Sequence, residues 1–298
     1  MLGNDLGSND MSWLMSENVR MKNSEKVKSI INKLIVGGKD MLQVISDFDY
    51  TLTKQHENGK RCLSSFGIFE VSEHLPAHYR EKSLVLFDKY HPIEVCHKMT
   101  VEEKVPHMIQ WYKEAETLLT GCYLTPQDII NAVQETHTAM RDGTDDMMNT
   151  LEKAGIPVLV LSAGIGDVVQ AVLKKHAILH PNVSIVSNFL MFSQVDTNIV
   201  LDGFQGEFIH VFNKHAAGSG PNKSGHSRSH VILLGDNVGD AGMAEVVQPT
   251  PLAVLKIGFL YEKSEERLPS FLEHFDIVLI DDQTMCFMNK LLQLIIEK

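Results

Sequence analysis

The sequence is poor in cysteine and has no long hydrophobic run. Its 298 residues include four cysteines, Cys62, Cys96, Cys122 and Cys286, with no C-x-x-C spacing among them. Scattered thiols in a chain of this length indicate reduced cysteines rather than a disulfide framework. No apolar stretch approaches the ~18 residues of a membrane span. The first ten residues show no basic cluster followed by an apolar run, as a secretory signal would. We therefore expect a cytoplasmic protein with no membrane segment.

Basic residues are also in the minority. The chain has 27 Lys and Arg against 38 Asp and Glu, a net charge of −11. This balance argues against binding to a nucleic-acid backbone or an anionic membrane. A small anionic substrate is not excluded, because a few buried cations can hold a phosphate inside an acidic protein. The length predicts about two domains of ~150 residues each, and we expect a monomer.

Short apolar runs give the chain its pattern. The runs 42–45, 158–161 and 231–234 each end in polar residues or glycine, and the runs 183–186 and 277–280 are similar. Such runs, separated by helical spacing, predict parallel strands covered on both faces. A helix is predicted over 24–34, stopped by Gly37 and Gly38. The fold class is therefore α/β, with a three-layer Rossmann-like core.

The middle of the chain has a different texture. Residues 80–89, 101–119 and 126–140 show helical spacing with no comparable strand between them. This predicts a helical cap at 55–145, inserted into an α/β core of residues 1–54 and 146–298. The remaining segments are predicted as a loosely held lead-in (1–23), a hairpin (203–212) and a loop (216–229).

Three strand ends carry polar side chains. Asp47 and Asp49 follow the first run, Ser162 follows the second, and Asp236 follows the third. Ligands of α/β sheets bind beyond the carboxyl ends of the strands, so we expect these groups to meet at one edge. Two carboxylates at i and i+2 repel each other unless a cation or a proton intervenes. Oxygen ligands of this kind suit Mg²⁺.

A lone D-x-D can be an acidic turn, and this one does not fit an EF-hand loop, whose glycine would fall at Leu52. The whole string from Asp47 to Thr53 behind an apolar strand nevertheless resembles the first motif of the haloacid dehalogenase superfamily. Matches to its later motifs follow in order. They are Ser162 at the phosphate-binding position, Lys214 at the basic position, and the stretch 235–240 at the acidic metal-binding position.

Further stretches resemble the cytosolic pyrimidine 5′-nucleotidase (type III) family, which includes a branch acting on 7-methylguanosine monophosphate. They lie at 92–95, 100–104, 161–167 and 210–215. The resemblance runs from about residue 25 to the C-terminus. It implies a 5′-nucleotidase that takes phosphate from a small nucleotide, with Mg²⁺ as cofactor.

The same resemblance assigns roles to individual residues. Asp47 would be the nucleophile and Asp49 the acid/base, and Asp47, Asp49 and Asp236 would bind Mg²⁺, Asp49 through its backbone carbonyl. Ser162, Ala163 and Lys214 would hold the phosphate, Glu94 would contact the base, and Asp240 would position Lys214 or a metal-bound water.

The base end of the site is less certain from the sequence. Where the family often has a serine contact, this chain has Ala115. Trp111 and Tyr112 lie in a helical segment, where one is expected to be buried and the other could stack on the base. Both pyrimidine and 7-methylguanosine substrates remain open.

Other interpretations are weaker but stay open at this point. The same site could serve another small phosphate ester, as a phosphatase or a phosphotransferase, or the chain could be an inactive nucleotide-binding module. Gly164 and Gly166 suggest a dinucleotide site, but Val169 replaces its third glycine. The stretch 218–224 is not a true phosphate-binding loop, and the pair His74 and His78 lacks the pattern of a zinc site.

Overall fold

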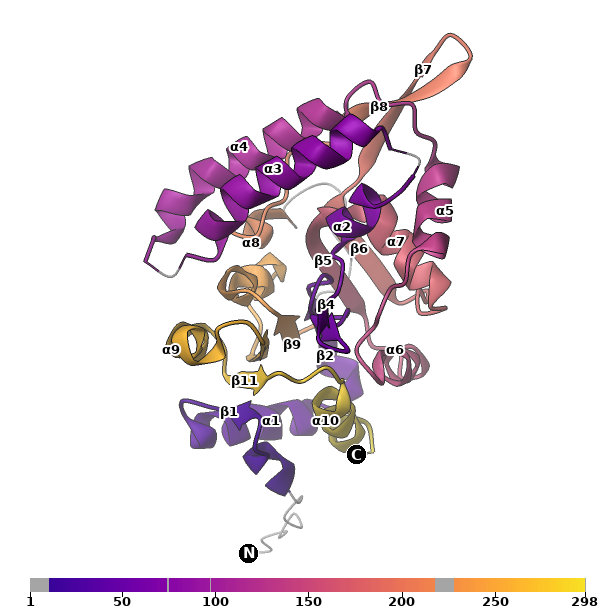
Figure 1. The fold of residues 1–298 in the computed structure, drawn as a ribbon. Helices are drawn as coiled ribbons and strands as arrows, with labels where there is room; N and C mark the ends of the chain where they lie inside the picture. Colours follow the sequence, from indigo (N-terminus) through magenta and orange to yellow (C-terminus); the bar gives the residue numbers. More distant parts are fainter. Residues whose placement is uncertain (1–10, 74, 97, 218–227, 298) are drawn as a thin grey trace, which may run out of the picture.

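The computed structural model describes residues 11–73, 75–96, 98–217 and 228–297. Within these ranges seven strands form the central sheet, in the order β1-β11-β10-β9-β2-β5-β6 (Figure 1). They are β1 (Val19–Arg20), β2 (Leu42–Ser46), β5 (Val158–Ile165), β6 (Val183–Asn188), β9 (His230–Gly235), β10 (Ala253–Leu260) and β11 (Ile277–Ile280). Neighbouring strands run parallel, except that β1 is antiparallel to β11. The expected parallel α/β sheet is confirmed.

Helices cover both faces of this sheet. One face packs against α1 (Ser24–Gly37), α6 (Thr144–Lys153), α7 (Gly166–Lys175) and α10 (Cys286–Ile296), and the other against α9 (Ser264–His274) and the 3₁₀ segment η3 (Val238–Val246). Side chains of a strand alternate between the faces: Val44 joins the first core and Ile45 the second. Burial on both sides explains why the strands are almost wholly apolar.

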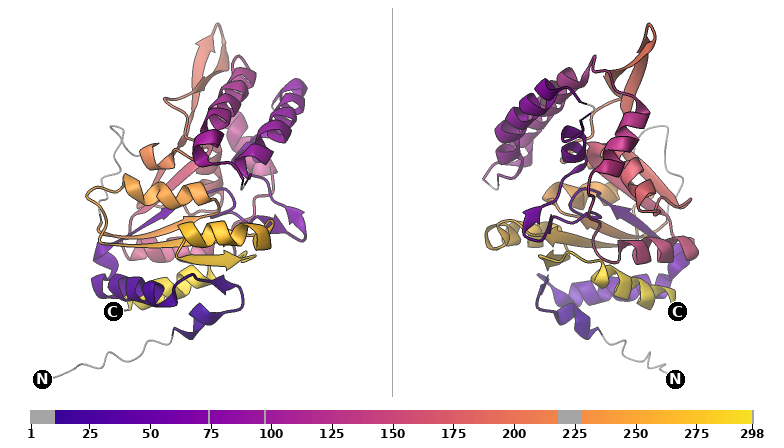
Figure 2. Two further views of the ribbon diagram at one scale, coloured as in Figure 1. Left: turned by 90° about the vertical axis from the view of Figure 1, so that its left-hand side faces the viewer. Right: turned by 45° about the vertical axis from the view of Figure 1, so that its right-hand side comes forward.

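The elements between β2 and β5 are mostly helical. They are β3 (His56–Glu57), β4 (Lys60–Arg61), α2 (Ser65–Glu70), α3 (Ala77–Glu94), α4 (Val101–Leu119) and α5 (Pro126–Glu135). Helices α3 and α4 pack along each other and stand over the carboxyl end of the sheet (Figures 1 and 2), whereas α5 packs against α7. Thr100 begins α4 with a capping box, in which its hydroxyl and the Glu103 carboxylate each accept a backbone N–H of the other residue.

Most expected elements are present, with shifted ends. All five predicted strands form, α1 extends to Gly37, and α4 has the predicted bounds. The helix predicted over 126–140 stops at Glu135, because Thr136 leaves the helical region (φ −91°, ψ 135°). The next residues instead pair with the loop after β2, through a bridge between Met140 and Thr53.

Two predictions for irregular segments are wrong. The hairpin lies not at 203–212 but at β7 (Leu190–Val195) and β8 (Asn198–Phe204), and it projects beside the inserted helices (Figure 2). Its strands mix polar with apolar residues and are only partly buried, so they lack the apolar signal that marks the central strands. Residues 11–23 are not a loose lead-in either, since Leu14 and Val19 are buried in the core.

The remaining elements are short or were missed. Strand β10 was not predicted, because Lys256 interrupts its apolar run; its partly buried side chain lies between buried neighbours. The chain also contains η1 (Ser12–Met15), η2 (Lys39–Met41) and α8 (Lys214–Ala217). The stretch 218–224 and His74 lie outside the described residues. None of the described helices has both the length and the apolar character of a membrane span.

Candidate active site

The site forms where three neighbouring strands end. Strand β2 lies between β5 and β9, and its last residue, Ser46, is level with Val160 and Leu234. The residues that follow, Asp47 after β2 and Asp236 after β9, therefore emerge side by side. All seven predicted site residues line one cleft, namely Asp47, Asp49, Glu94, Ser162, Ala163, Lys214 and Asp236.

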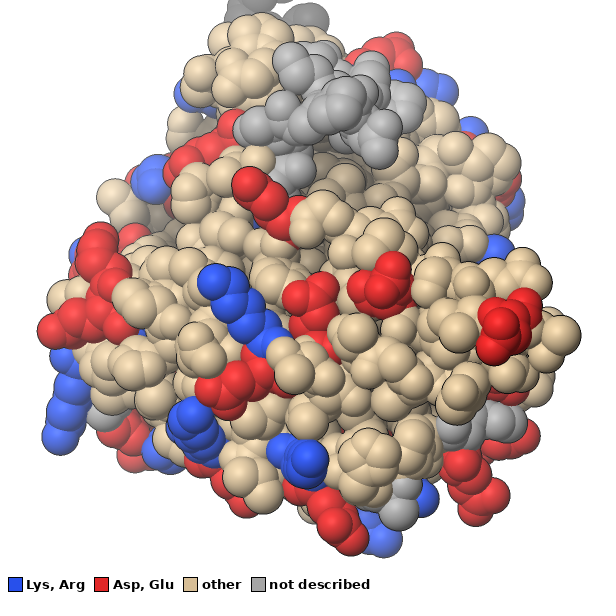
Figure 3. All heavy atoms as spheres, turned by 90° about the horizontal axis from the view of Figure 1, so that it is seen from above, with Lys and Arg blue, Asp and Glu red and all other residues tan. Residues whose placement is uncertain are grey.

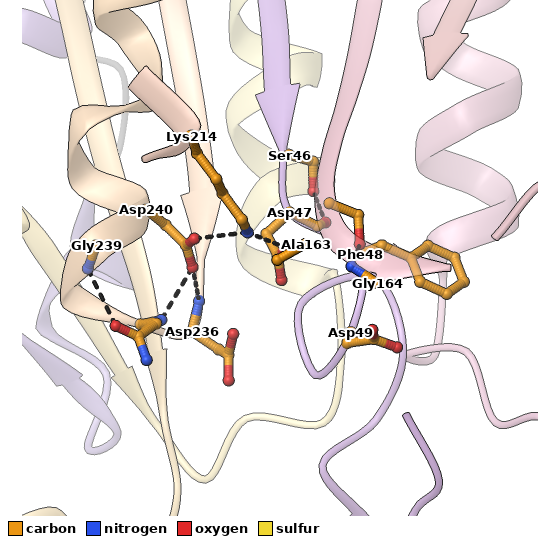
Figure 4. A network of polar contacts seen from close by, with 12 residues as sticks. Ser46, Asp47, Phe48, Asp49, Ala163, Gly164, Lys214, Asp236, Gly239 and Asp240 are labelled. Carbon is orange, nitrogen blue, oxygen red and sulfur yellow. Dashed lines mark hydrogen bonds and ion pairs between the residues drawn. The ribbon is translucent and has the colours of Figure 1, made fainter. Parts of the chain in front are cut away.

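Lys214 links two carboxylates at the floor of this cleft. Its Nζ atom is 2.5 Å from Oδ1 of Asp47 and 2.8 Å from Oδ1 of Asp240 (Figure 4). All three side chains are almost fully buried. The two carboxylates raise the pKa of Lys214 against the opposing effect of its burial, so the lysine is charged. Lys214 can therefore neutralise charge on an incoming phosphate while these carboxylates keep its side chain in position.

Asp236 adds a third carboxylate to this cluster. Ligand oxygens of Asp47, Asp236 and Asp240 all lie within 4.8 Å of one another. Burial, followed by the charges of Asp47 and Asp240, raises the pKa of Asp236 well above its ordinary value. Three acidic groups share one lysine, so a second cation is favoured, and an all-oxygen donor set fits Mg²⁺.

Asp240 also holds the turn after β9. Its Oδ2 atom accepts the backbone N–H groups of Asp236 (3.1 Å) and Asn237 (3.0 Å). These bonds and the Lys214 contact occupy both of its carboxylate oxygens. The geometry suits a residue that fixes Lys214 and the turn after β9.

Asp49 is held separately, by the first residue of α2. The N–H and the hydroxyl of Ser65 each donate to its carboxylate at 2.6 Å. Burial raises the pKa of Asp49, and the two Ser65 bonds oppose that rise. Asp49 stands apart from the Asp47–Lys214–Asp240 contacts in Figure 4. The sequence reasoning missed Ser65, although the pair Ser64-Ser65 before an apolar stretch is a helix-start signal.

A buried arginine fixes the loop that follows Asp49. Arg141 donates to the backbone carbonyls of Tyr50 (2.6 Å), Thr51 (2.7 Å) and Asp282. Thr53 completes the turn, because its Oγ1 accepts the N–H of Tyr50, whose φ is +61°. Nothing in the sequence around Arg141 identified this role, which depends on a contact 90 residues distant in the chain.

The phosphate-binding positions are buried at the end of β5. Oγ of Ser162 accepts the N–H of Gly164 at 3.0 Å, and no described residue accepts its proton, which leaves that proton free to reach a phosphate oxygen. The Ala163 carbonyl accepts the Tyr112 hydroxyl and the Asn188 amide, both at 2.8 Å. Tyr112 thus ties α4 to the strand end.

The two glycines that suggested a dinucleotide site have packing roles. A Cβ atom on Gly164 would lie 2.0 Å from the Ser65 hydroxyl oxygen and 2.8 Å from an Asp49 carboxylate oxygen. One on Gly166 would lie 2.9 Å from the Phe189 ring. Both positions require glycine because side chains approach closely, which accounts for the motif without a dinucleotide.

The far end of the cleft lies under the inserted helices. Glu94, near the end of α3, contacts Nδ1 of His91 at 3.1 Å, and its carbonyl accepts the Lys104 ammonium at 3.0 Å. Tyr112 lines the cleft, whereas Trp111 and Ala115 line a neighbouring cavity. The Trp111 ring also stacks on Tyr90, with centroids 5.7 Å apart.

The acidic cluster predicts how Mg²⁺ and pH together affect the thermal stability of the protein. Burial raises the pKa of Asp240 from 3.8 to about 6. A carboxyl group whose pKa is raised on folding binds protons better when folded, so its contribution to stability falls as pH rises from about 4 to about 6. The pKa of Asp236 is also raised, and we expect Mg²⁺ held by Asp47 and Asp236 to compete with protons there. Mg²⁺ should therefore raise the melting temperature more at about pH 7.5 than at about pH 5. Equal shifts at both values in thermal unfolding would contradict a metal site in this cluster.

Comparisons with known proteins agree with this geometry. The profile of the pyrimidine 5′-nucleotidase (UMPH-1) family matches residues 50–296. A 7-methylguanosine phosphate-specific 5′-nucleotidase of Drosophila melanogaster is 40% identical, over 98% of this chain and 92% of that protein. The corresponding enzyme of Homo sapiens is 39% identical, over 95% and 94%. The crystal structure of cytosolic 5′-nucleotidase IIIB bound to cytidine aligns with a TM-score of 0.87 at 40% identity, covering 96% of each chain. The chain belongs to the pyrimidine 5′-nucleotidase (UMPH-1) family and is a hydrolase.

Proposed function

We propose that the protein is a Mg²⁺-dependent 5′-nucleotidase that hydrolyses 7-methylguanosine monophosphate and pyrimidine nucleoside monophosphates through a phosphorylated Asp47. The observation that carries this proposal is the buried contact of Asp47 with Lys214, beside Asp236 and Asp240. The names of the similar proteins support the two substrate classes. We also propose that it acts in the cytoplasm, which the name of the similar cytosolic 5′-nucleotidase IIIB supports. We propose a monomer, because one chain supplies all seven site residues of the cleft.

The chemistry follows from the residues around Asp47. A carboxylate oxygen of Asp47 attacks the phosphorus atom, and the nucleoside 5′-oxygen departs with a proton donated by Asp49. Asp49 then removes a proton from the water that attacks the aspartyl phosphate, which releases inorganic phosphate and restores Asp47. When bound, Mg²⁺ would be held by Asp47, Asp236 and the Asp49 carbonyl, and it would neutralise charge on the phosphate oxygens.

The other groups position the substrate. Lys214 and the Ser162 hydroxyl stabilise negative charge on the phosphoryl group as it transfers. Asp49 must carry a proton for the first step, and the burial that raises its pKa favours that state. We propose that residues 55–145 act as a cap over this chemistry, with Glu94 and Tyr112 contributing to the base site.

Steady-state assays with a panel of phosphate esters test the proposal. Nucleoside monophosphates should be hydrolysed only with Mg²⁺, and sugar phosphates should be poor substrates. Turnover in the presence of excess chelator, or a preference for sugar phosphates, would refute it. The second result would favour the alternative of a phosphatase for another small phosphate ester.

Tyr112 offers a separate test of the base site. We expect Tyr112→Ala to lower kcat/KM for 7-methylguanosine monophosphate by about 5–150-fold, the cost of a lost stacking contact of ~1–3 kcal/mol. Tyr112→Phe keeps the ring and loses only the bond to the Ala163 carbonyl. That variant should therefore rank CMP, UMP and 7-methylguanosine monophosphate as the wild type does. If Tyr112→Ala ranked the three nucleotides as the wild type does, the Tyr112 ring would not be part of the base site.

A further inference from the structure

A second cavity adjoins the catalytic cleft within the inserted helices. Three aromatic side chains, Phe66, Phe87 and Tyr112, line both spaces, so the cavity continues the cleft away from Asp47. Tyr79 and Trp111 add two more aromatic rings to its wall. Such walls favour a flat ring system, and they attract one that carries a positive charge.

Glu70 is the one charged side chain that the described residues place in the wall of this cavity. It is the last residue of α2, and its Oε1 accepts the hydroxyl of Ser83 on α3. Within the described part of the chain, Oε2 accepts no hydrogen bond and no cation pairs with the carboxylate. Burial raises the pKa of Glu70, and the Ser83 bond opposes that rise. A half-buried carboxylate with a free oxygen is costly unless a ligand completes it.

The base of the proposed substrate carries hydrogen-bond donors that the Glu70 carboxylate could accept. Guanine presents an imino N1–H and an amino N2–H₂ side by side, two donors that match the two oxygens of a carboxylate. Methylation at N7 gives the ring a positive charge. A cytosine or uracil ring is smaller and offers no such pair of adjacent donors on the edge that faces away from the sugar.

We propose that the second cavity receives the amino edge of 7-methylguanine and that Glu70, positioned by Ser83, accepts its N1–H and N2–H₂ donors. This inference rests on the proposed function and names the residue that selects a methylated purine within it. It also supplies a polar contact on the side of the cap where Ala115 offers none. Glu94 lines the cleft itself and not the second cavity.

The test compares two substrates that differ only in the 2-amino group. These are 7-methylguanosine 5′-monophosphate and 7-methylinosine 5′-monophosphate, assayed at a mildly acidic pH at which both keep N1–H and the positive charge on the base. In the wild type, the ratio of their kcat/KM values should be about 10–100, as for a lost hydrogen bond to a charged group. In Glu70→Gln the ratio should fall to within about threefold of one, since an amide oxygen already bonded to Ser83 accepts the amino group poorly.

Glu73→Gln is the matched control, because Glu73 is an exposed carboxylate three residues further along the chain. It should keep the wild-type ratio. Ser83→Ala retains the Glu70 charge but frees it to turn, and it should lower the ratio by about two- to fivefold. Melting temperatures of each variant separate a loss of folding from a loss of recognition.

Each outcome bears on one proposal. A wild-type ratio retained in Glu70→Gln overturns the role of Glu70 while leaving the nucleotidase function intact. No turnover of 7-methylguanosine monophosphate by the wild type overturns the proposed substrate, and this inference with it. Should Glu70→Gln fail to fold, Ser83→Ala carries the test, and a ratio within a factor of about two of both the wild type and Glu73→Gln overturns the proposal.

Discussion

Replacing Asp47 by Asn is expected to lower kcat by about 10⁴-fold or more, because the amide cannot attack phosphorus. The fold should remain intact, since Asn occupies nearly the same volume and Lys214 keeps its 2.8 Å contact with Asp240. The metal-free variant should melt at the same temperature as the wild type or above it. It carries one acidic group fewer in a buried cluster that lacks its cation.

Mass spectrometry and a matched control variant check this expectation. After rapid quenching with substrate, mass spectrometry should find a phosphoryl group on the wild-type peptide that contains Asp47 and on no other. Asp196→Asn is the matched control, because Asp196 is exposed in the turn between β7 and β8 and its φ of +55° suits Asn. Full activity in Asp47→Asn would end the covalent scheme, and equal losses in both variants would point to a preparation effect.

Replacing Lys214 by Met is expected to have the largest combined effect on stability and activity. The substitution removes the one lysine that the described residues place against the buried carboxylates of Asp47 and Asp240, beside the partly buried Asp236. Breaking a buried ion pair from one side costs about 3–5 kcal/mol of unfolding free energy. Turnover should fall by about 10²–10³-fold, the usual loss when a group that stabilises transition-state charge is removed.

Denaturant unfolding with and without Mg²⁺ measures the first effect. Mg²⁺ should recover part of the lost stability, since it supplies positive charge to the same carboxylates. Lys153→Met, an exposed lysine in the last turn of α6, should change neither stability nor activity. A Lys214→Met protein as stable as the wild type in the absence of metal would show that the pair is not buried as the structure has it.

The face above the inserted helices carries no continuous basic surface in its described part. Figure 3 shows Lys and Arg side chains interspersed with Asp and Glu around it. The cations that matter for a phosphate are instead inside, and Lys214 is 3% exposed. An acidic protein can therefore bind an anion, as the charge balance of the sequence left open.

The sequence predicted both the central strands and the catalytic turn because each depends on a local pattern of residues. Strands β2, β5 and β9 are short apolar runs that end abruptly, so both their existence and their endpoints are local features. The hairpin was misplaced because β7 and β8 are only partly buried and mix polar with apolar residues. Strand β10 was missed because a single lysine broke a run whose neighbours are buried.

What the sequence by itself determined was the inventory of reactive groups and the order of their strands. Chemical identity and spacing are local properties, so Asp47, Asp49, Ser162 and Asp236 could be named from the ends of apolar runs, and Lys214 from the family resemblance. Only the tertiary structure placed Ser65 on Asp49, Arg141 behind the catalytic loop, and Glu70 in an aromatic cavity. These contacts join segments that lie far apart in the chain, and no periodic pattern in the sequence indicates that they meet. Their strength depends on burial, which only the packing of the whole chain determines.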